Sequence, residues 1–123
     1  NKDKIFSSPV PGYLEQVFYH DLIADADGFA SGLLMNPKKN IGLFVRYRQK
    51  ELPRYIEWKM MGEGTYVVGM EPANCGVGGR AKERAAGTLQ FLEPGEERHF
   101  LVQIGVLEGE EALSNFITKN TLK

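Results

Sequence analysis

The fold is decided by one stretch of the sequence: Trp58-Lys59-Met60-Met61-Gly62-Glu63-Gly64-Thr65-Tyr66-Val67-Val68-Gly69-Met70-Glu71-Pro72-Ala73-Asn74-Cys75. Apolar residues flank a Gly-Glu-Gly turn at positions 62–64, so the stretch predicts a short β-hairpin. The second strand ends in a carboxylate that is followed at once by proline. Because Pro72 has a fixed φ and favours extended geometry in the residue before it, we expect Glu71 at a strand end with little backbone freedom.

Trp58 and Glu71 have two interpretations from their residue types alone. The structural interpretation is a buried tryptophan and an edge carboxylate that pairs with a nearby arginine. The functional interpretation is a binding face, because the flat apolar ring of a tryptophan is a surface on which sugar rings stack. Residue types by themselves favour the structural interpretation.

Composition limits the class of protein. A chain of 123 residues with 42% hydrophobic and 25% charged residues is typical of one globular domain. A net charge of −1 gives no basic surface for nucleic acid or an anionic membrane. No apolar run approaches the roughly 20 residues that span a bilayer. The single cysteine, Cys75, excludes an internal disulfide and fits a cytoplasmic location. Because the sequence starts at Asn1 without a methionine, we expect it to be cut from a longer chain.

The first third of the chain predicts an arm and a hairpin. Residues 1–13 contain Ser-Ser-Pro-Val-Pro-Gly and are expected to form an extended arm. Aromatic and branched residues dominate 14–24, which we predict to be a strand. Asp25-Ala26-Asp27-Gly28 is a strong turn signal, and 29–35 is expected to return as the second strand of that hairpin.

The remaining elements follow the same logic. Apolar residues alternate through 41–48, and this period of two indicates a strand. Residues 75–87 are rich in glycine and then basic, so we expect a loop with at most one helical turn. The other expected strands are 54–60, 66–71, 88–92 and 98–107, of which the last two form a hairpin around Glu93-Pro94-Gly95-Glu96.

Only the C-terminal tail has a helical pattern. It begins with acidic residues after Gly109 and carries an apolar stripe that includes Leu113 and Phe116. The sequence therefore predicts an all-β chain, with an antiparallel β-sandwich of at least seven strands over residues 14–108. A short helix and tail are expected over residues 109–123.

Other combinations of reactive residues carry little signal. The glycines at 76–79 lack the spacing of a phosphate-binding loop. His20, His99 and Cys75 lie far apart in the sequence, so no metal site is predicted. The basic residues after the glycines are either a solvated face or a contact for a sugar phosphate; they are Arg80, Lys82 and Arg84.

Three segments together resemble the galactose mutarotase (aldose 1-epimerase) superfamily, especially its branch of unknown function. Pro11-Gly12-Tyr13-Leu14-Glu15-Gln16-Val17-Phe18 resembles the Gly-Tyr-Asp-His-x-Phe strand of mutarotases. Tyr66-Val67-Val68-Gly69-Met70-Glu71-Pro72-Ala73-Asn74 resembles the strand that carries the catalytic glutamate of that family. Leu92-Glu93-Pro94-Gly95-Glu96 resembles the turn before the last strand. The resemblance runs from Pro11 to about Leu107.

The resemblance implies a fold and a chemistry. The chain corresponds to the C-terminal part of a large antiparallel β-supersandwich, and the catalytic histidines of the family lie upstream of it. Mutarotases interconvert sugar anomers without a cofactor, and the resemblance makes Glu71 the general base. The residues expected to bind the sugar or sugar phosphate are Glu15, Trp58, His20, Asn74 and Arg80. The sequence departs from the family where Leu14-Glu15-Gln16 replaces Asp-His, and its Glu-Pro-Ala-Asn continuation belongs to the branch of unknown function.

Two other functions stay open at the level of sequence. One is a carbohydrate-binding β-sandwich in which Glu71 and Trp58 bind a sugar but do not turn it over. The other is a structural fragment that acts only together with the missing half of the protein. An acid histidine opposite Glu71 would separate these possibilities, and the sequence supplies only His20 and His99. We expect a second copy of the chain, or the missing N-terminal half, to cover the exposed sheet.

Overall fold

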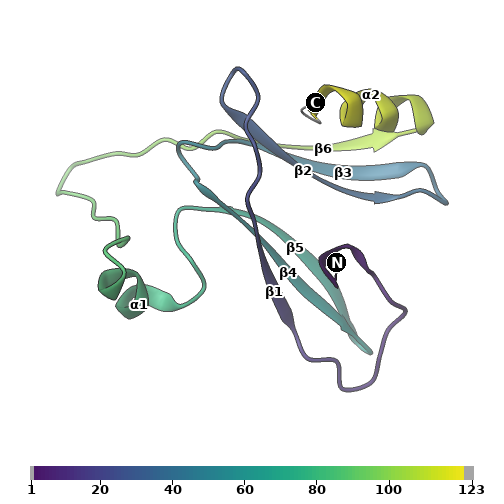
Figure 1. Cartoon of the computed structure of the whole chain (residues 1–123), viewed down its shortest axis with the longest axis horizontal. Coiled ribbons are helices and arrows are strands. Elements are labelled where there is room, and N and C mark those ends of the chain that lie inside the picture. The colour runs from purple at the N-terminus through teal and green to yellow at the C-terminus, as the bar shows by residue number, and fades with distance from the viewer. Residues whose placement is uncertain (1, 121–123) are drawn as a thin grey trace.

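The computed structural model describes residues 2–120. Its strands form two three-stranded antiparallel sheets that lie in two layers (Figure 1). Sheet A has the order β1-β4-β5, and sheet B has the order β2-β3-β6. The strands are β1 (Gln16–His20), β2 (Phe29–Asn36), β3 (Ile41–Arg48), β4 (Arg54–Gly62), β5 (Thr65–Ala73) and β6 (Val102–Glu108). The predicted all-β antiparallel sandwich with a short C-terminal helix is confirmed.

In the described part of the chain, helix is confined to three short segments. They are a 3₁₀ turn η1 (Lys2–Lys4), the helix α1 (Gly79–Ala85) and the helix α2 (Glu110–Asn120). In Figure 1, α2 lies on the outer side of sheet B, and α1 lies beyond one end of sheet A. Within residues 2–120, no helix is long and apolar enough to cross a membrane. Residue 1 of the expected arm and residues 121–123 of the expected tail lie outside the described residues.

The two sheets meet through a small aromatic core. Tyr47 of β3 stacks on Tyr55 of β4 with ring centroids 5.9 Å apart, and Ala30 of β2 lies fully buried beside them. Burial raises the pKa of Tyr47 to about 12 and also raises the pKa of Tyr55. Gly32 is required at this contact, because a Cβ atom there would collide with the hydroxyl of Tyr55. The face of sheet A that carries Tyr55 is therefore its inner face.

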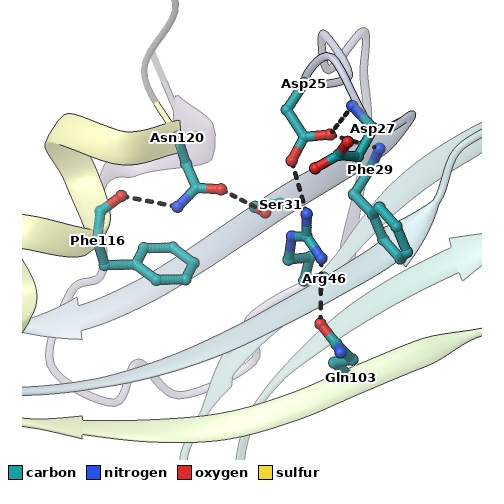
Figure 2. Close-up of polar contacts among 8 residues, drawn as sticks. All are labelled: Asp25, Asp27, Phe29, Ser31, Arg46, Gln103, Phe116 and Asn120. Atoms are coloured by element: carbon teal, nitrogen blue, oxygen red, sulfur yellow. Dashed lines mark hydrogen bonds and ion pairs between the residues drawn. The ribbon is translucent and has the colours of Figure 1, made fainter.

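The outer face of sheet B is covered by α2. Phe116 packs on Phe44 with ring centroids 4.9 Å apart. Figure 2 shows that Oγ of Ser31 donates a hydrogen bond to Oδ1 of Asn120 over 2.9 Å, while the amide of Asn120 donates to the carbonyl of Phe116. Apolar packing and this polar contact together hold the last described turn of the helix on β2.

A charged contact fixes the start of β2. Oδ1 of Asp25 accepts hydrogen bonds from the backbone N–H groups of Asp27 and Phe29, and Oδ2 accepts one from Arg46 over 2.7 Å (Figure 2). These bonds lower the pKa of Asp25, and the bond from the backbone of Phe29 contributes most. The guanidinium of Arg46 also lies 3.9 Å from the ring centroid of Phe29, which is a cation–π contact. The predicted turn is present and is held by its own aspartate.

The predicted N-terminal hairpin is wrong. The strand expected over 14–24 is limited to β1, and β1 pairs with β4 rather than with β2. Residues 21–28 instead carry the chain from sheet A to sheet B. The predicted turn at residues 25–28 is present, but a turn does not specify which strands pair across it.

The predicted final hairpin is also wrong. Among residues 88–101 there is no strand, so the described chain has six strands instead of seven or more. Side-chain bonds organise this segment: the guanidinium of Arg98 donates to Oε1 of Gln90, and Oε2 of Glu96 accepts from the backbone of Glu93. The loop expected over 75–87 contains α1, which is longer than the single turn predicted.

The N-terminal arm is anchored by a buried lysine. Lys59 on the inner face of β4 is only 1% exposed. Its ammonium donates hydrogen bonds to the backbone carbonyls of Lys2, over 2.6 Å, and of Ile5. It also lies 4.5 Å from the ring centroid of Phe6. Carbonyl oxygens and aromatic rings replace the water that a buried ammonium would lose.

Candidate functional site

The candidate site is the outer face of sheet A, opposite the face that carries Tyr55. In the register of β4 and β5, Trp58 lies opposite Gly69, and Ile56 lies opposite Glu71. Because residues directly opposite in an antiparallel pair share a face, Trp58 and Glu71 both point away from sheet B. This outer face therefore brings together the two residues around which the sequence is organised.

The side chain of Glu71 folds back along its own strand over Gly69. A Cβ atom at Gly69 would collide with Oε1 of Glu71, so only glycine leaves this space open. Gly69 is the residue directly opposite Trp58, and the carboxylate is thereby directed along the strand towards the indole. Glu71 itself is exposed, which leaves the carboxylate accessible to a ligand.

Glu15 joins the same face through the indole of Trp58. Nε1–H of Trp58 donates a hydrogen bond to Oε2 of Glu15 over 2.7 Å. Val17 lies opposite Trp58 in the register of β1 and β4, so Glu15, two residues before it, belongs to the same side. The outer face thus carries a carboxylate from each edge of sheet A, with a half-buried tryptophan between them.

The chain that leaves Glu71 is closed into a compact loop by Glu83. Oε1 of Glu83 accepts from the backbone N–H of Gly76 over 2.9 Å, and Oε2 accepts from the hydroxyl of Thr88 over 2.6 Å. A guanidinium nitrogen of Arg54 lies 3.8 Å from Oε2. Hydrogen bonds from Thr88 and then from Gly76 are the main causes that lower the pKa of Glu83.

A second contact attaches this loop to the outer face of sheet A. The hydroxyl oxygen of Tyr19, on β1, accepts a hydrogen bond from the backbone N–H of Val77 over 2.9 Å. Asn74 lies one residue beyond the end of β5 and is half-buried. Arg80 lies at the start of α1 and is exposed. Both residues therefore belong to the loop beside Glu71, although neither is on the face of sheet A.

His20 lies on the inner face and is separated from Glu71 by the thickness of sheet A. It lies opposite Tyr55 in the register of β1 and β4, and its ring meets the ring of Tyr55 edge-on with centroids 5.9 Å apart. Its Nε2 is 2.9 Å from Oε2 of Glu57, also on the inner face. The structure thus brings Glu15, Trp58 and Glu71 together, places Asn74 and Arg80 nearby in the loop, and does not bring His20 to this face.

One protein family matches most of the chain. The family described as "Domain of unknown function (DUF4432)" matches residues 1–106. The chain belongs to this family. No curated protein matches the sequence.

The DUF4432 chain is similar in fold to a solved structure, that of a protein from Klebsiella pneumoniae subsp. pneumoniae MGH 78578 described as a "putative aldose 1-epimerase". The TM-score is 0.86 and the sequence identity is 21%. The match covers 94% of this chain and 30% of the Klebsiella chain, so the sequence spans about a third of the length of that protein. At this identity the likeness shows the fold, which is that of an aldose-epimerase-like sandwich.

The chemistry open to this DUF4432 site is that of carboxylates beside an aromatic ring. Glu15 and Glu71 can accept hydrogen bonds from hydroxyl groups, and Glu71 can also take a proton. The indole N–H of Trp58 already donates to Glu15, so the ring is held for packing rather than for a further donor bond. Among residues 2–120, no group of three His, Cys, Asp or Glu side chains is arranged to hold a metal ion.

Two acidic residues near these faces were not identified from the sequence. Glu83 is one of several charged residues in a basic helix, and only the loop closure reveals that it is buried. Glu57 alternates with Ile56 and Trp58, and these apolar side chains indicate a buried surface on the other face of β4. The polar side chains at Glu57 and Lys59 were the available sign that the inner face is not purely apolar.

Proposed function

We propose that the protein containing this chain interconverts the anomers of a sugar, with Glu71 as the general base. The proposal is supported most directly by the shared outer face of Glu15, Trp58 and Glu71. A fold similar to that of a protein described as an aldose 1-epimerase adds to this support.

The reaction needs one base and one acid. Glu71 removes the proton from the hydroxyl group on C1 while an acid protonates the ring oxygen, and the bond between C1 and the ring oxygen breaks. The open-chain aldehyde turns about its C1–C2 bond. The hydroxyl formed from the ring oxygen then attacks the other face of the carbonyl carbon and returns its proton to the acid. The carbonyl oxygen becomes the new C1 hydroxyl by taking back the proton held by Glu71. The carboxylate must reach within about 2.6–3.2 Å of the hydroxyl.

Glu15 and Trp58 act as the binding surface for the ring. The apolar face of the sugar packs on the indole, and Glu15 accepts a hydrogen bond from a sugar hydroxyl. Asn74 adds a polar contact from the loop beside Glu71. Arg80, exposed at the start of α1, contacts an anionic substituent when the substrate is a sugar phosphate.

The acid comes from outside the described residues. His20 lies on the inner face of sheet A, and His99 lies in the segment 88–101, which is not a strand of sheet A. A longer chain, or a second copy, would bring the acid to the outer face. This requirement is consistent with a sequence that spans about a third of the length of the similar Klebsiella protein.

A carbohydrate-binding function without turnover is the second candidate. It is favoured by the exposure of Glu71 and by the lack of an acid histidine on the outer face of the described sheet. Saturation-transfer NMR of the intact protein with a panel of aldoses and their phosphates separates the two functions. Transfer of magnetisation between the two anomers supports turnover, whereas line broadening of sugar signals without transfer supports binding alone.

The same proposal includes a cover for the apolar edge of the sandwich. Val102, Ile104 and Val106 share the inner side of β6, and Ile104 is 71% exposed. Contiguous apolar patches beyond a few hundred Å² are rare on soluble monomers. We expect the rest of a larger sandwich, or a second copy of the chain, to pack on this edge.

Cys75 is free and exposed, which suits the reducing environment of the cytoplasm.

A further inference from the structure

The two sheets enclose a cleft on the side of sheet A opposite Glu71. Its volume is about 500 Å³, which is within the usual range for small-molecule sites. Its walls come from β1, β2, β4 and β5, and the N-terminal arm closes one side through Asp3, Lys4 and Phe6. Most of the lining is apolar, and the apolar residues include Leu22, Leu33, Leu34, Met35, Val68 and Met70.

Glu57 is the polar group in this wall that lacks a complete set of partners. The residue is only 9% exposed. Its Oε2 pairs with Nε2 of His20 over 2.9 Å, but within residues 2–120 its Oε1 has no hydrogen-bond partner. A buried carboxylate oxygen without a donor is costly, and such groups are rare in folded proteins. Rotation about the last bond of the side chain is soft, so the carboxylate can present this oxygen to the cleft.

The neighbouring charges restrict the donor that fits this oxygen. His20 already contacts the other oxygen, and Lys4 lines the cleft. Lys59 is two residues from Glu57 on the same face, but its ammonium is occupied by backbone carbonyls of the arm. An added ammonium would be repelled by the ammonium groups of Lys4 and Lys59. A neutral hydroxyl donates to Glu57 without this repulsion.

We propose that this cleft is a second binding site, for a small neutral molecule that carries a hydroxyl group on an apolar body. The hydroxyl donates to Glu57, and the apolar body packs against Leu34, Val68 and Met70. Small alcohols and phenols have this chemistry. The site is separate from the outer face of sheet A, and it does not depend on the proposed epimerase activity.

A matched pair of probes tests the proposal in the full chain. p-Cresol and toluene have nearly the same shape, and only p-cresol carries the donor. Binding is followed by ¹³C NMR of the methionine methyl groups. Met70 lies opposite Glu57 and lines the cleft, while Met60 points to the other face of β4 and serves as the internal control.

We expect p-cresol to shift the signal of Met70 but not that of Met60, and to bind roughly tenfold more tightly than toluene. Glu57→Leu should keep the toluene affinity and remove the advantage of p-cresol. Glu57→Gln, which keeps the shape but not the charge, should reduce that advantage several-fold. Retained toluene binding shows that each variant is folded.

Four results would overturn the proposal, and the first three concern affinity. They are the absence of binding by either probe, equal affinities of the wild type for the two probes, and a p-cresol advantage that survives in Glu57→Leu. Shifts confined to Met60 would move the binding to the outer face and would also contradict it.

Discussion

Nε1 of Trp58 and Oε2 of Glu15 are 2.7 Å apart, and this hydrogen bond joins the residue before β1 to the middle of β4. It aligns the plane of the indole and directs one carboxylate oxygen at the same time. Because Glu71 shares this face, the pair forms one side of a surface on which a flat ring can lie with carboxylates at both ends.

Trp58→Phe tests whether this bond positions Glu15. The variant keeps an aromatic ring but removes the donor, so we expect sugar binding to weaken by about 1 kcal/mol, roughly fivefold. Affinity is measured by NMR titration of the intact protein with a sugar that the wild type binds. Glu15→Gln, which keeps the acceptor oxygen, is the matched control and should weaken binding less. Wild-type affinity in Trp58→Phe would mean that the bond has no role in binding.

Gly69→Ala tests whether the space over Gly69 directs Glu71. The new Cβ meets Oε1 of Glu71, which lies at the end of a flexible side chain and can move away. We therefore expect anomer interconversion to fall by at least tenfold while the melting temperature changes by less than about 2 °C. Thr65→Ala, at an exposed position at the other end of β5, is the control and should retain full activity. A variant that melts much lower would instead show that Gly69 is needed for folding.

Glu83→Gln tests the loop closure through its dependence on pH. The folded-state pKa of Glu83 is lowered, so its carboxylate stabilises the fold above its ordinary pKa of about 4.5. This stabilisation is lost as the pH falls through the folded-state value. The variant should therefore melt below the wild type at pH 7, and the gap should close at lower pH. Glu97→Gln, at an exposed glutamate, should show no such gap; a Glu83→Gln gap that stays constant with pH would contradict this assignment.

Ile104→Asp tests the expected cover of the sandwich edge. Its side chain is 71% exposed on the inner side of β6, and a charge there should prevent packing of another apolar surface. If a second copy covers the edge, sedimentation should change from dimer to monomer. If the rest of a longer chain covers it, the intact protein should instead lose stability by about 1–3 kcal/mol. No change in either measurement would show that the edge is free.

Local sequence patterns predicted the elements better than their pairing. Alternation through β3 gives its limits correctly, and the Gly-Glu-Gly turn correctly separates β4 from β5. The expectation that the strand ends at Glu71 is wrong, because Pro72 pairs with Tyr55 and β5 continues to Ala73. Proline is tolerated there because β5 is an edge strand of sheet A. The partner of β1 could not be predicted, because β1 and β4 are nearly 40 residues apart and a turn signal between β1 and β2 is equally compatible with a crossover between sheets.

The same limit applies to the site. Period two places Glu15 on one face of its strand, and the register of β4 and β5 is needed to bring Trp58 and Glu71 to that face. His20 shows the difference: its residue type is suitable for acid catalysis, but the face on which it lies is set by pairing with Tyr55. Burial of Glu57 and Glu83 depends on contacts between segments, which no local pattern contains.

The central claim is that Glu71 is the base, and one comparison tests it most directly. Anomer interconversion is measured by saturation-transfer NMR on the intact wild type, on Glu71→Gln, and on Glu63→Gln, which changes an exposed glutamate in the turn of the same hairpin. Loss of a general base typically costs about 10²–10⁴ in rate, whereas loss of a surface carboxylate changes stability by about 0.5 kcal/mol or less. We predict that Glu71→Gln loses at least 10² in rate with an unchanged melting temperature, while Glu63→Gln matches the wild type. A Glu71→Gln variant as fast as the wild type would show that Glu71 is not the base.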